Sequence, residues 1–231
     1  MKWIIVLILA IFLISGCTNN VCKSFWNCTE WSECIRTGAE TGNESRICMD
    51  ENNCNIDTDK PSESQTCRLP KITTKAPSEM VLQLSDLGAS NWTVDERSVR
   101  TKSEMQEDDL EKGWETGYRV SYIIIREQDL SNVTTVENYL SIYPIENIST
   151  VLTPRESDED LTWENLPDPK IGSQSMAFRV TTKDSFGNPD EVYFMIEFVK
   201  LNVYESLLMH GKSTDYEFLN NLAKKVEQKI E

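Results

Sequence analysis

The chemistry that this sequence offers most clearly is that of cysteine thiols. Six of the seven cysteines lie within 46 residues: Cys22, Cys28, Cys34, Cys48, Cys54 and Cys67. An even, clustered set of this kind is typical of a disulfide framework in an oxidising compartment. Structural zinc is the alternative, but the set contains no Cys-x-x-Cys pair, and the only histidine of the chain is the distant His210. We therefore expect all six cysteines to form disulfides.

The seventh cysteine, Cys17, ends a segment that is typical of an export signal. Lys2 gives a positive start, residues 3–14 form an unbroken apolar run, and the small residues Ser15 and Gly16 precede the cysteine. The run of twelve residues is short for a membrane-spanning helix, which needs about 20 residues. We therefore interpret residues 1–16 as a signal peptide.

The sequence ISGC at residues 14–17 resembles a lipobox, the site at which prokaryotic lipoproteins are cleaved and acylated. Small residues let the peptidase hold an extended backbone, and the thiol accepts the diacylglycerol. The resemblance implies a lipid on Cys17 that holds the protein at the outer, extracytoplasmic face of the cell membrane, with two or more acyl chains for stable attachment. An ordinary signal peptide with a chance cysteine and an uncleaved anchor are the alternatives.

The acidic composition excludes several classes of partner. The net charge is −15, and loss of Lys2 with the signal leaves the mature chain at −15 − 1 = −16. Such a surface repels phosphate backbones and anionic lipids, so we expect no nucleic-acid partner and no electrostatic adhesion to a membrane. Solubility outside the cell is the simplest interpretation of the charge.

No pattern of residues predicts catalysis, a metal or a cofactor. His210 follows an apolar strand, where an isolated histidine is usually structural or exposed. Acidic runs such as Asp108-Asp109 fall in loops or on exposed helices and indicate solvated surfaces. Asn55, Asp57 and Asp59 have the spacing of a calcium loop but lack its glycine and its final acid. We expect no enzyme activity, no catalytic residue and no metal or cofactor.

Five Asn-x-Ser/Thr sequons are candidate N-glycosylation sites, and we expect each asparagine to be exposed if it is used. They begin at Asn27, Asn43, Asn91, Asn132 and Asn147.

Composition divides the chain after the signal into four parts. A tether at 17–21 precedes the cysteine-rich module at 22–67, and residues 68–77 contain two prolines and no acid, which predicts an extended linker. Residues 78–231 lack cysteine and are long enough for one domain with its own core.

Alternation of apolar residues predicts that this last domain is mainly an antiparallel sheet packed with helices, an α+β fold. A closing helix is expected from a capping box at 214–217, with its apolar face formed by Phe218, Leu219, Leu222, Val226 and Ile230. Short helices are expected at 104–112 and 145–153. The expected strands are residues 92–99, 118–126, 136–143, 175–182, 191–199 and 203–209.

The cysteine-rich module resembles a thrombospondin type 1 repeat. The resemblance is carried by WSEC at 31–34, Gly42, RIC at 46–48, Cys54, the Pro61-x-Glu63 pair and Cys67. It implies a thin, three-stranded, disulfide-stapled fold in which Arg46, and also Arg36, stack on Trp26 and Trp31. Cation–π stacking and disulfides would then replace a core that so few residues cannot build.

The same resemblance implies the disulfides Cys48–Cys54 and Cys34–Cys67, which leaves Cys22–Cys28; six cysteines allow fifteen pairings in all. The module departs from the family because no cysteine follows WSEC closely and because its two tryptophans lack the Trp-x-x-Trp spacing. With four basic and nine acidic residues between 22 and 67, it also lacks a basic face for sulfated glycans.

The domain at 78–231 is similar to PsbP-like exported domains through GWETGY at 113–118, IGSQSMA at 171–177, FVKLN at 198–202 and the closing helix. That resemblance implies a fold and no shared catalytic site.

Three functions follow from these features. The first is a membrane-anchored surface module that binds a protein or small ligand, which predicts a closed, mostly apolar pocket between sheet and helix. The second is an assembly factor that docks on a membrane complex through a flat apolar patch. The third is an extracellular hydrolase, which predicts facing carboxylates in a deep cleft. The missing motifs count against the third.

Overall fold

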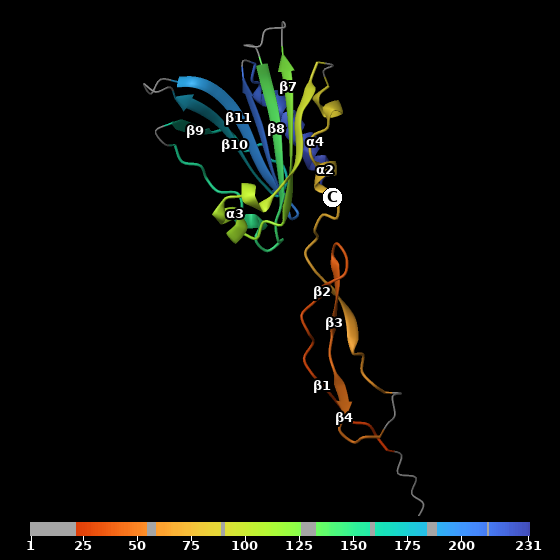
Figure 1. Cartoon of the computed structure of the whole chain (residues 1–231). Coiled ribbons are helices and arrows are strands. Elements are labelled where there is room, and N and C mark those ends of the chain that lie inside the picture. Colours follow the sequence, from red (N-terminus) through yellow and green to blue (C-terminus); the bar gives the residue numbers. More distant parts are fainter. Residues whose placement is uncertain are drawn as a thin grey trace, which may run out of the picture. The chain divides into compact units, whose positions relative to one another are not determined.

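The computed structural model describes residues 22–54, 59–88, 91–125, 133–157, 160–183, 189–211 and 213–231. The chain divides into two compact units, residues 1–69 and 70–231 (Figure 1). Within the described residues, no helix is long and apolar enough to cross a membrane. The proposed lipid site Cys17 lies outside the described residues, and so do residues 55–58 of the calcium-like spacing at 55–59.

The first unit consists of two small antiparallel sheets. β1 (Trp26–Cys28) pairs with β4 (Cys48–Asp50), and β3 (Thr41–Ser45) lies between β2 (Ile35–Arg36) and β5 (Ser64–Arg68). Among the described residues of this unit, Cys48 alone is a fully buried hydrophobic residue. With so little apolar surface removed from water, covalent cross-links must supply most of the stability.

Three disulfides hold the first unit, and all six predicted cysteines take part. The pairs are Cys22–Cys54, Cys28–Cys48 and Cys34–Cys67. The last pair agrees with the pairing that the thrombospondin resemblance implied, but Cys48–Cys54 and Cys22–Cys28 are wrong. The reason is the register of β1 on β4, which sets Cys28 directly opposite Cys48 with their Cα atoms 4.0 Å apart.

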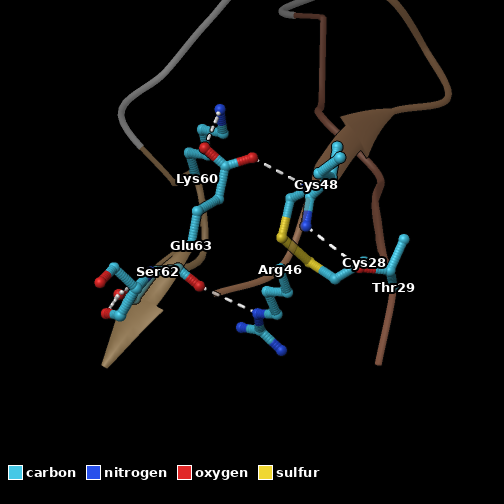
Figure 2. The surroundings of a disulfide bond; sticks show 9 residues. Cys28, Thr29, Arg46, Cys48, Lys60, Ser62 and Glu63 are labelled. Atoms are coloured by element: carbon cyan, nitrogen blue, oxygen red, sulfur yellow. Dashed lines mark hydrogen bonds and ion pairs between the residues drawn. A yellow bond between two sulfur atoms is a disulfide. The ribbon is translucent and has the colours of Figure 1, made fainter. Parts of the chain in front are cut away.

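Glu63, directly before β5, bonds the backbone of Cys48 in the Cys28–Cys48 disulfide (Figure 2). Its carboxylate accepts the backbone N–H of Cys48 at 2.8 Å and the Lys60 ammonium at 2.7 Å. The hydrogen bond from Lys60, followed by that from Cys48, lowers the pKa of the Glu63 carboxyl. The Pro-x-Glu motif therefore places an ionised acceptor where the chain passes the disulfide.

Cations lie over both tryptophans of the first unit. The Arg46 guanidinium is 4.4 Å from the ring centroid of Trp31, and its Nε donates to the Ser62 carbonyl at 2.9 Å. Over Trp26 lies the Lys60 ammonium, at 5.7 Å. The guanidinium of Arg36 donates to the carbonyls of residues 38 and 39.

The second unit is a seven-stranded antiparallel sheet flanked by helices, so the α+β prediction is confirmed (Figure 1). Its strands are β6 (Thr93–Arg100), β7 (Thr116–Ile125), β8 (Val133–Ile142), β9 (Leu161–Asn165), β10 (Gln174–Lys183), β11 (Pro189–Lys200) and β12 (Val203–Gly211). Its helices are α2 (Pro77–Met80), η1 (Leu84–Leu87), η2 (Lys102–Glu104), α3 (Glu107–Glu111), η3 (Ile148–Thr150) and α4 (Tyr216–Lys229).

The strand order is β6-β7-β8-β12-β11-β10-β9. Two meanders, β6 to β8 and β9 to β12, are therefore joined edge to edge where β12 pairs with β8 from Val203↔Ile142 to Gly211↔Thr134. This pairing places residues that are more than sixty positions apart in the sequence side by side at the centre of the sheet.

The six predicted strands occur as β6, β7, β8, β10, β11 and β12, and β9 is the strand that the sequence reasoning missed. The capping box at 214–217 is displaced by one residue, because Asp215 is the N-cap and accepts the backbone N–H of Phe218 at 3.2 Å. In place of the helix expected at 145–153, the structure has only the short helix η3. The helix expected at 104–112 occurs as α3. It ends shortly before Gly113, whose backbone is in the left-handed region (φ 84°).

One face of the sheet, which we call the helix face, is covered by α4 against β11 and β12 and by α2 against β7 and β8. Leu219, Leu222, Val226 and Ile230 of the predicted apolar stripe are buried there, whereas Phe218 is only partly buried and stacks on Trp92. Period-two alternation sends every second residue of the central strands to this face, such as Phe198 of β11 and Leu207 of β12.

A polar pair is buried within the helix face. The Asn138 side chain accepts the backbone N–H of Leu82 at 2.8 Å and donates to Glu205 Oε2 at 2.5 Å, which fixes the segment before η1 on the sheet. Glu205 is fully buried, and this burial, opposed by the bond from Asn138, raises the pKa of its carboxyl well above its usual range. Burial therefore favours the protonated form of this carboxyl in the folded protein.

Most of the expected linker belongs to the second unit. Thr73 is buried and its N–H donates to Asn202 Oδ1 at 2.8 Å, while Lys75 Nζ donates to the Lys229 carbonyl at 2.8 Å. The compact unit begins at Pro70, so only residues 68 and 69 of the proposed spacer lie with the first unit.

The buried Glu205 predicts an unusual pH dependence. The folded state retains a proton that the unfolded chain releases near pH 4.5, so the free energy of unfolding falls as pH rises above that value. Glu205→Gln keeps the shape and the acceptor but has no proton to lose. We expect its Tm to match that of the wild type at about pH 4 and to exceed it at about pH 8.

Thermal melts of both proteins across this pH range make the measurement. Glu164→Gln removes an exposed carboxylate from β9 and is the matched control, for which no such pH-dependent gain is expected. A Tm difference for Glu205→Gln that is the same at both pH values would contradict the prediction.

Candidate functional site

The face of the sheet opposite α4, which we call the open face, carries rows of polar side chains. Directly opposed residues share a face, so the register defines each row. One row contains Ser98, Arg119, Tyr139, Ser206 and Glu197, and the next contains Arg100, Gly117, Ser141 and Tyr204. The long β8–β12 pairing thus assembles charged and hydroxyl groups from five strands on one surface.

A polar pocket of about 270 Å³ lies over these two rows. Arg100, Lys112 and Arg155 are its cations, Asp108, Asp109 and Glu197 are its carboxylates, and Tyr139, Tyr143 and Tyr204 add their hydroxyls. The loop that contains α3 supplies Asp108, Asp109 and Lys112, and the segment after η3 supplies Arg155.

Glu197 is the buried charge of the polar pocket. It is 1 % exposed, and its Oε1 accepts from Arg155 Nη2 at 2.8 Å and from the Tyr204 hydroxyl at 2.7 Å. Burial opposes ionisation of Arg155, but the charge of Glu197 outweighs it and the arginine pKa is raised. Burial and then Glu197 raise the pKa of Tyr204 well above its usual range, so this hydroxyl is a donor to the carboxylate.

The side of the pocket nearest β6 is organised by Tyr139. Arg100 lies 5.4 Å and Arg119 lies 5.9 Å from its ring centroid, so two cations occupy the aromatic surface. Its hydroxyl donates to Glu137, and burial and then that carboxylate raise the pKa of Tyr139 to about 12. Arg119 is also paired with Glu96.

Two bonds attach the α3 loop to the sheet. The Tyr143 hydroxyl donates to Asp109 Oδ1 at 2.8 Å, and the indole Nε1 of Trp114 donates to Ser141 Oγ at 3.0 Å. Arg100 Nη1 donates to the same Ser141 Oγ at 3.1 Å. A Cβ at Gly117 would stand 2.5 Å from a backbone oxygen and 3.1 Å from Trp114, so glycine is required where Trp114 crosses the row.

An apolar pocket of about 310 Å³ adjoins the polar pocket, and Met195 lines both. Its other lining residues are Trp163, Glu191, Tyr193, Leu208 and His210. His210 Nε2 lies 3.1 Å from Glu137 Oε1, and this contact raises the pKa of the imidazole. His210 is therefore an ion-pair partner of Glu137 on the open face.

The sequons differ in exposure. Asn27, Asn43 and Asn91 are exposed, and Asn132 lies outside the described residues. Asn147 is only partly exposed, and its side-chain amide donates to the Lys112 carbonyl at 2.9 Å. A glycan on Asn147 would be attached to the same Nδ2 atom that bonds the α3 loop and would leave it a single N–H.

None of the predicted functional residues lies in either pocket, and Glu197, Arg155 and Tyr204 were not predicted. One local signal was present: Glu197 is the single acid inside the otherwise apolar run 192–199, and an acid within a buried strand demands a partner. Its charged partner, Arg155, comes from a loop segment 42 residues away, which no local pattern identifies.

The pairing of charges in the polar pocket is suited to binding. Lys112 is 2.9 Å from Asp108, a hydrogen bond that lowers the pKa of that aspartate, and Arg155 is 2.8 Å from Glu197. No group of three or more potential metal ligands occurs among the described residues. The carboxyl with a strongly raised pKa, Glu205, lies on the helix face, away from the pockets.

The Arg155–Glu197 pair predicts an asymmetric pattern of stability. Arg155→Met leaves a carboxylate buried without its cation, a change that costs about 3–5 kcal/mol in a fully buried pair. Because the Arg155 side chain is 42 % exposed, we expect a smaller loss of about 1–3 kcal/mol. Adding Glu197→Gln removes the stranded charge, so the double variant should be more stable than Arg155→Met alone.

Urea unfolding of the two single variants and the double variant measures this coupling. Arg179→Met removes the exposed partner of Glu164, 3.7 Å away, and should cost less than about 0.5 kcal/mol. A double variant no more stable than Arg155→Met would show that Glu197 is not the charge that Arg155 compensates.

Comparison with known proteins does not identify a family for this chain. No protein-family model matches the chain, and no curated protein matches it. Among solved structures, the extracellular domain of PknH from Mycobacterium tuberculosis superposes with a TM-score of 0.45 and 11 % sequence identity, over 69 % of this chain and 98 % of that domain. A likeness this distant assigns neither a family nor a function to the chain.

Proposed function

We propose that this protein is an extracytoplasmic binding lipoprotein, held at the membrane through Cys17, whose second unit binds a small ligand on the open face. The observation that carries the proposal is the pair of adjoining pockets over β8, β12 and β11, where a buried carboxylate and three tyrosines face an accessible cavity. Helices α4 and α2 cover the other face of the sheet, whereas the two pockets lie on this one.

The pocket differs from the closed, apolar one expected for a binding module, because it is polar and lies on the face opposite α4. A cleft with carboxylates was the feature that would favour a hydrolase. Binding is the better reading of this cleft since Lys112 lowers the pKa of Asp108, the Tyr143 hydroxyl donates to Asp109, and the Arg155 guanidinium is paired with Glu197. Acid–base catalysis would require a carboxyl free to exchange its proton with a substrate.

Export is supported by the disulfides. Three cross-links in a unit with almost no apolar core are suited to an oxidising compartment, and the segment before Cys17 has the pattern of a signal. In this proposal the first unit acts as a stapled spacer between the lipid and the binding unit; its resemblance to thrombospondin repeats makes a protein contact the alternative.

Ligand capture tests the binding proposal. Purified protein lacking the signal is incubated with a small-molecule extract of the source cells, separated by gel filtration, denatured, and its released molecules identified by mass spectrometry. Ser206→Trp, which fills the polar pocket from its floor, is the blocked variant, and Asn43→Trp on exposed β3 is the control. We expect a molecule retained by the wild type and the control but lost from the blocked variant; retention of none would refute the proposal.

The anchor is tested separately. We expect Cys17→Ala to release the protein from the membrane fraction or to leave its signal uncut, because the thiol is the acceptor of the lipid. Mass spectrometry of the membrane-extracted wild-type N-terminus should show an acylated cysteine. An unmodified chain that begins at another residue would exclude a lipid anchor.

A further inference from the structure

The open face changes from charged to apolar along the strands. On β11, Glu197, Met195 and Tyr193 follow one another at two-residue intervals, so they point to the same side. On β12 their neighbours are Ser206 opposite Glu197 and Leu208 opposite Met195. The polar pocket and the apolar pocket are therefore two ends of one surface, and Met195 lies at the point where they meet.

The charges of the polar pocket cancel. Its three cations, Arg100, Lys112 and Arg155, equal its three carboxylates, Asp108, Asp109 and Glu197, in number. Lys112 pairs with Asp108 at 2.9 Å and Arg155 pairs with Glu197 at 2.8 Å, while Arg100 is bonded to Ser141 and Asp109 to Tyr143. A ligand with a net charge would disturb this balance and leave one charge of the pocket uncompensated, which costs binding free energy. An uncharged head group avoids that cost.

One buried acceptor in this pocket has no protein donor. Glu197 Oε2 is buried, and no described residue donates a hydrogen bond to it, whereas Oε1 accepts two. An unsatisfied carboxylate oxygen in a buried position is costly, so it favours a ligand that brings an O–H group. Tyr204, Ser206 and Arg100 add donors and acceptors within the same pocket, as several hydroxyls on one head group would require.

The spacing sets the size of the ligand. Glu197 and Tyr193 are four residues apart on an extended strand, a separation of about 13 Å at a rise of about 3.3 Å per residue. Trp163, Met195 and Leu208 supply apolar surface at the far end, where Trp163 also meets Phe178 edge to face. Burial of an alkyl segment there is favourable by about 25 cal/mol for each Å² removed from water.

We infer that the ligand is a small amphipathic molecule with an uncharged, hydroxyl-bearing head, of the alkyl glycoside class, whose head donates to Glu197 Oε2 and whose tail lies against Met195, Leu208 and Trp163. This inference rests on the proposed binding function and specifies its ligand.

Three probes with one tail and different heads test the class: hexyl β-D-glucoside, hexyltrimethylammonium and hexyl sulfate, each below its micelle concentration. Titration calorimetry on the wild-type protein should show saturable binding of the glucoside at least tenfold tighter than that of either charged probe. Glucose alone should bind at least tenfold more weakly than hexyl glucoside, because it lacks the tail. Tighter binding of a charged probe, or no saturable binding of the glucoside, would overturn the inference.

Two variants then test which residues contact the head and the tail of the ligand. Glu197→Gln should weaken hexyl glucoside at least fivefold, and Leu208→Asn should weaken hexyl glucoside without changing the affinity of glucose. Glu164→Gln, outside both pockets, is the control. Equal affinity of the wild type and Glu197→Gln would remove Glu197 as the acceptor and overturn the head assignment. The head comparison uses the wild type alone, so it stands even where a variant fails to fold.

The two proposals fail separately. If ligand capture yields a molecule that Ser206→Trp loses while the glucoside does not bind, the binding function stands and the ligand class is wrong. If capture yields nothing and no probe binds, both are wrong.

Discussion

The pairing of β12 with β8 is the constraint on which the rest of the second unit depends. It joins two meanders that are each antiparallel along the chain, and its register from Val203↔Ile142 to Gly211↔Thr134 aligns every row of the sheet. A slip of one residue would exchange the faces, sending Ser206 and Tyr204 into the apolar core and Leu207 to the surface. Both the core and the pocket are therefore set by one register.

Two glutamates show how the faces differ. Glu205 and Glu197 lie on neighbouring strands in adjacent rows, opposite Phe198 and Ser206 respectively. Among the described residues the Asn138 amide is bonded to Glu205 on the helix face, and burial raises the pKa of this carboxyl well above its usual range. On the open face Arg155 approaches from the segment after η3 and donates to Glu197, which is as deeply buried. A loop thus supplies a charged partner to one buried acid, whereas a neutral amide faces the other.

Local patterns predicted most of the fold, and the misses have physical causes. Strand alternation and the amphipathic face of α4 are properties of contiguous residues, so β6, β7, β8, β10, β11, β12 and α4 were recognised. β9 is a five-residue edge strand with one half-buried aromatic, Trp163, between the polar residues Thr162 and Glu164, and its pattern is weak. The linker was misjudged because Thr73 is fixed by Asn202, a contact across 129 residues. The predicted disulfide partner of Cys28 was wrong for the same reason, because the register of β1 on β4 determines that partner.

The polar pocket was not predictable from the sequence, because none of its residues belongs to a local motif that indicates a binding site. Arg100, Tyr139, Ser206 and Glu197 come from four strands, and only the rows bring them together. The proposed anchor and the proposed ligand nevertheless agree in physical terms. A molecule with a short apolar tail partitions toward a bilayer surface, and a binding unit tethered there would meet it at a raised effective concentration. A modest intrinsic affinity for such a ligand would then be sufficient, which suits an accessible pocket whose own charges are paired before the ligand arrives.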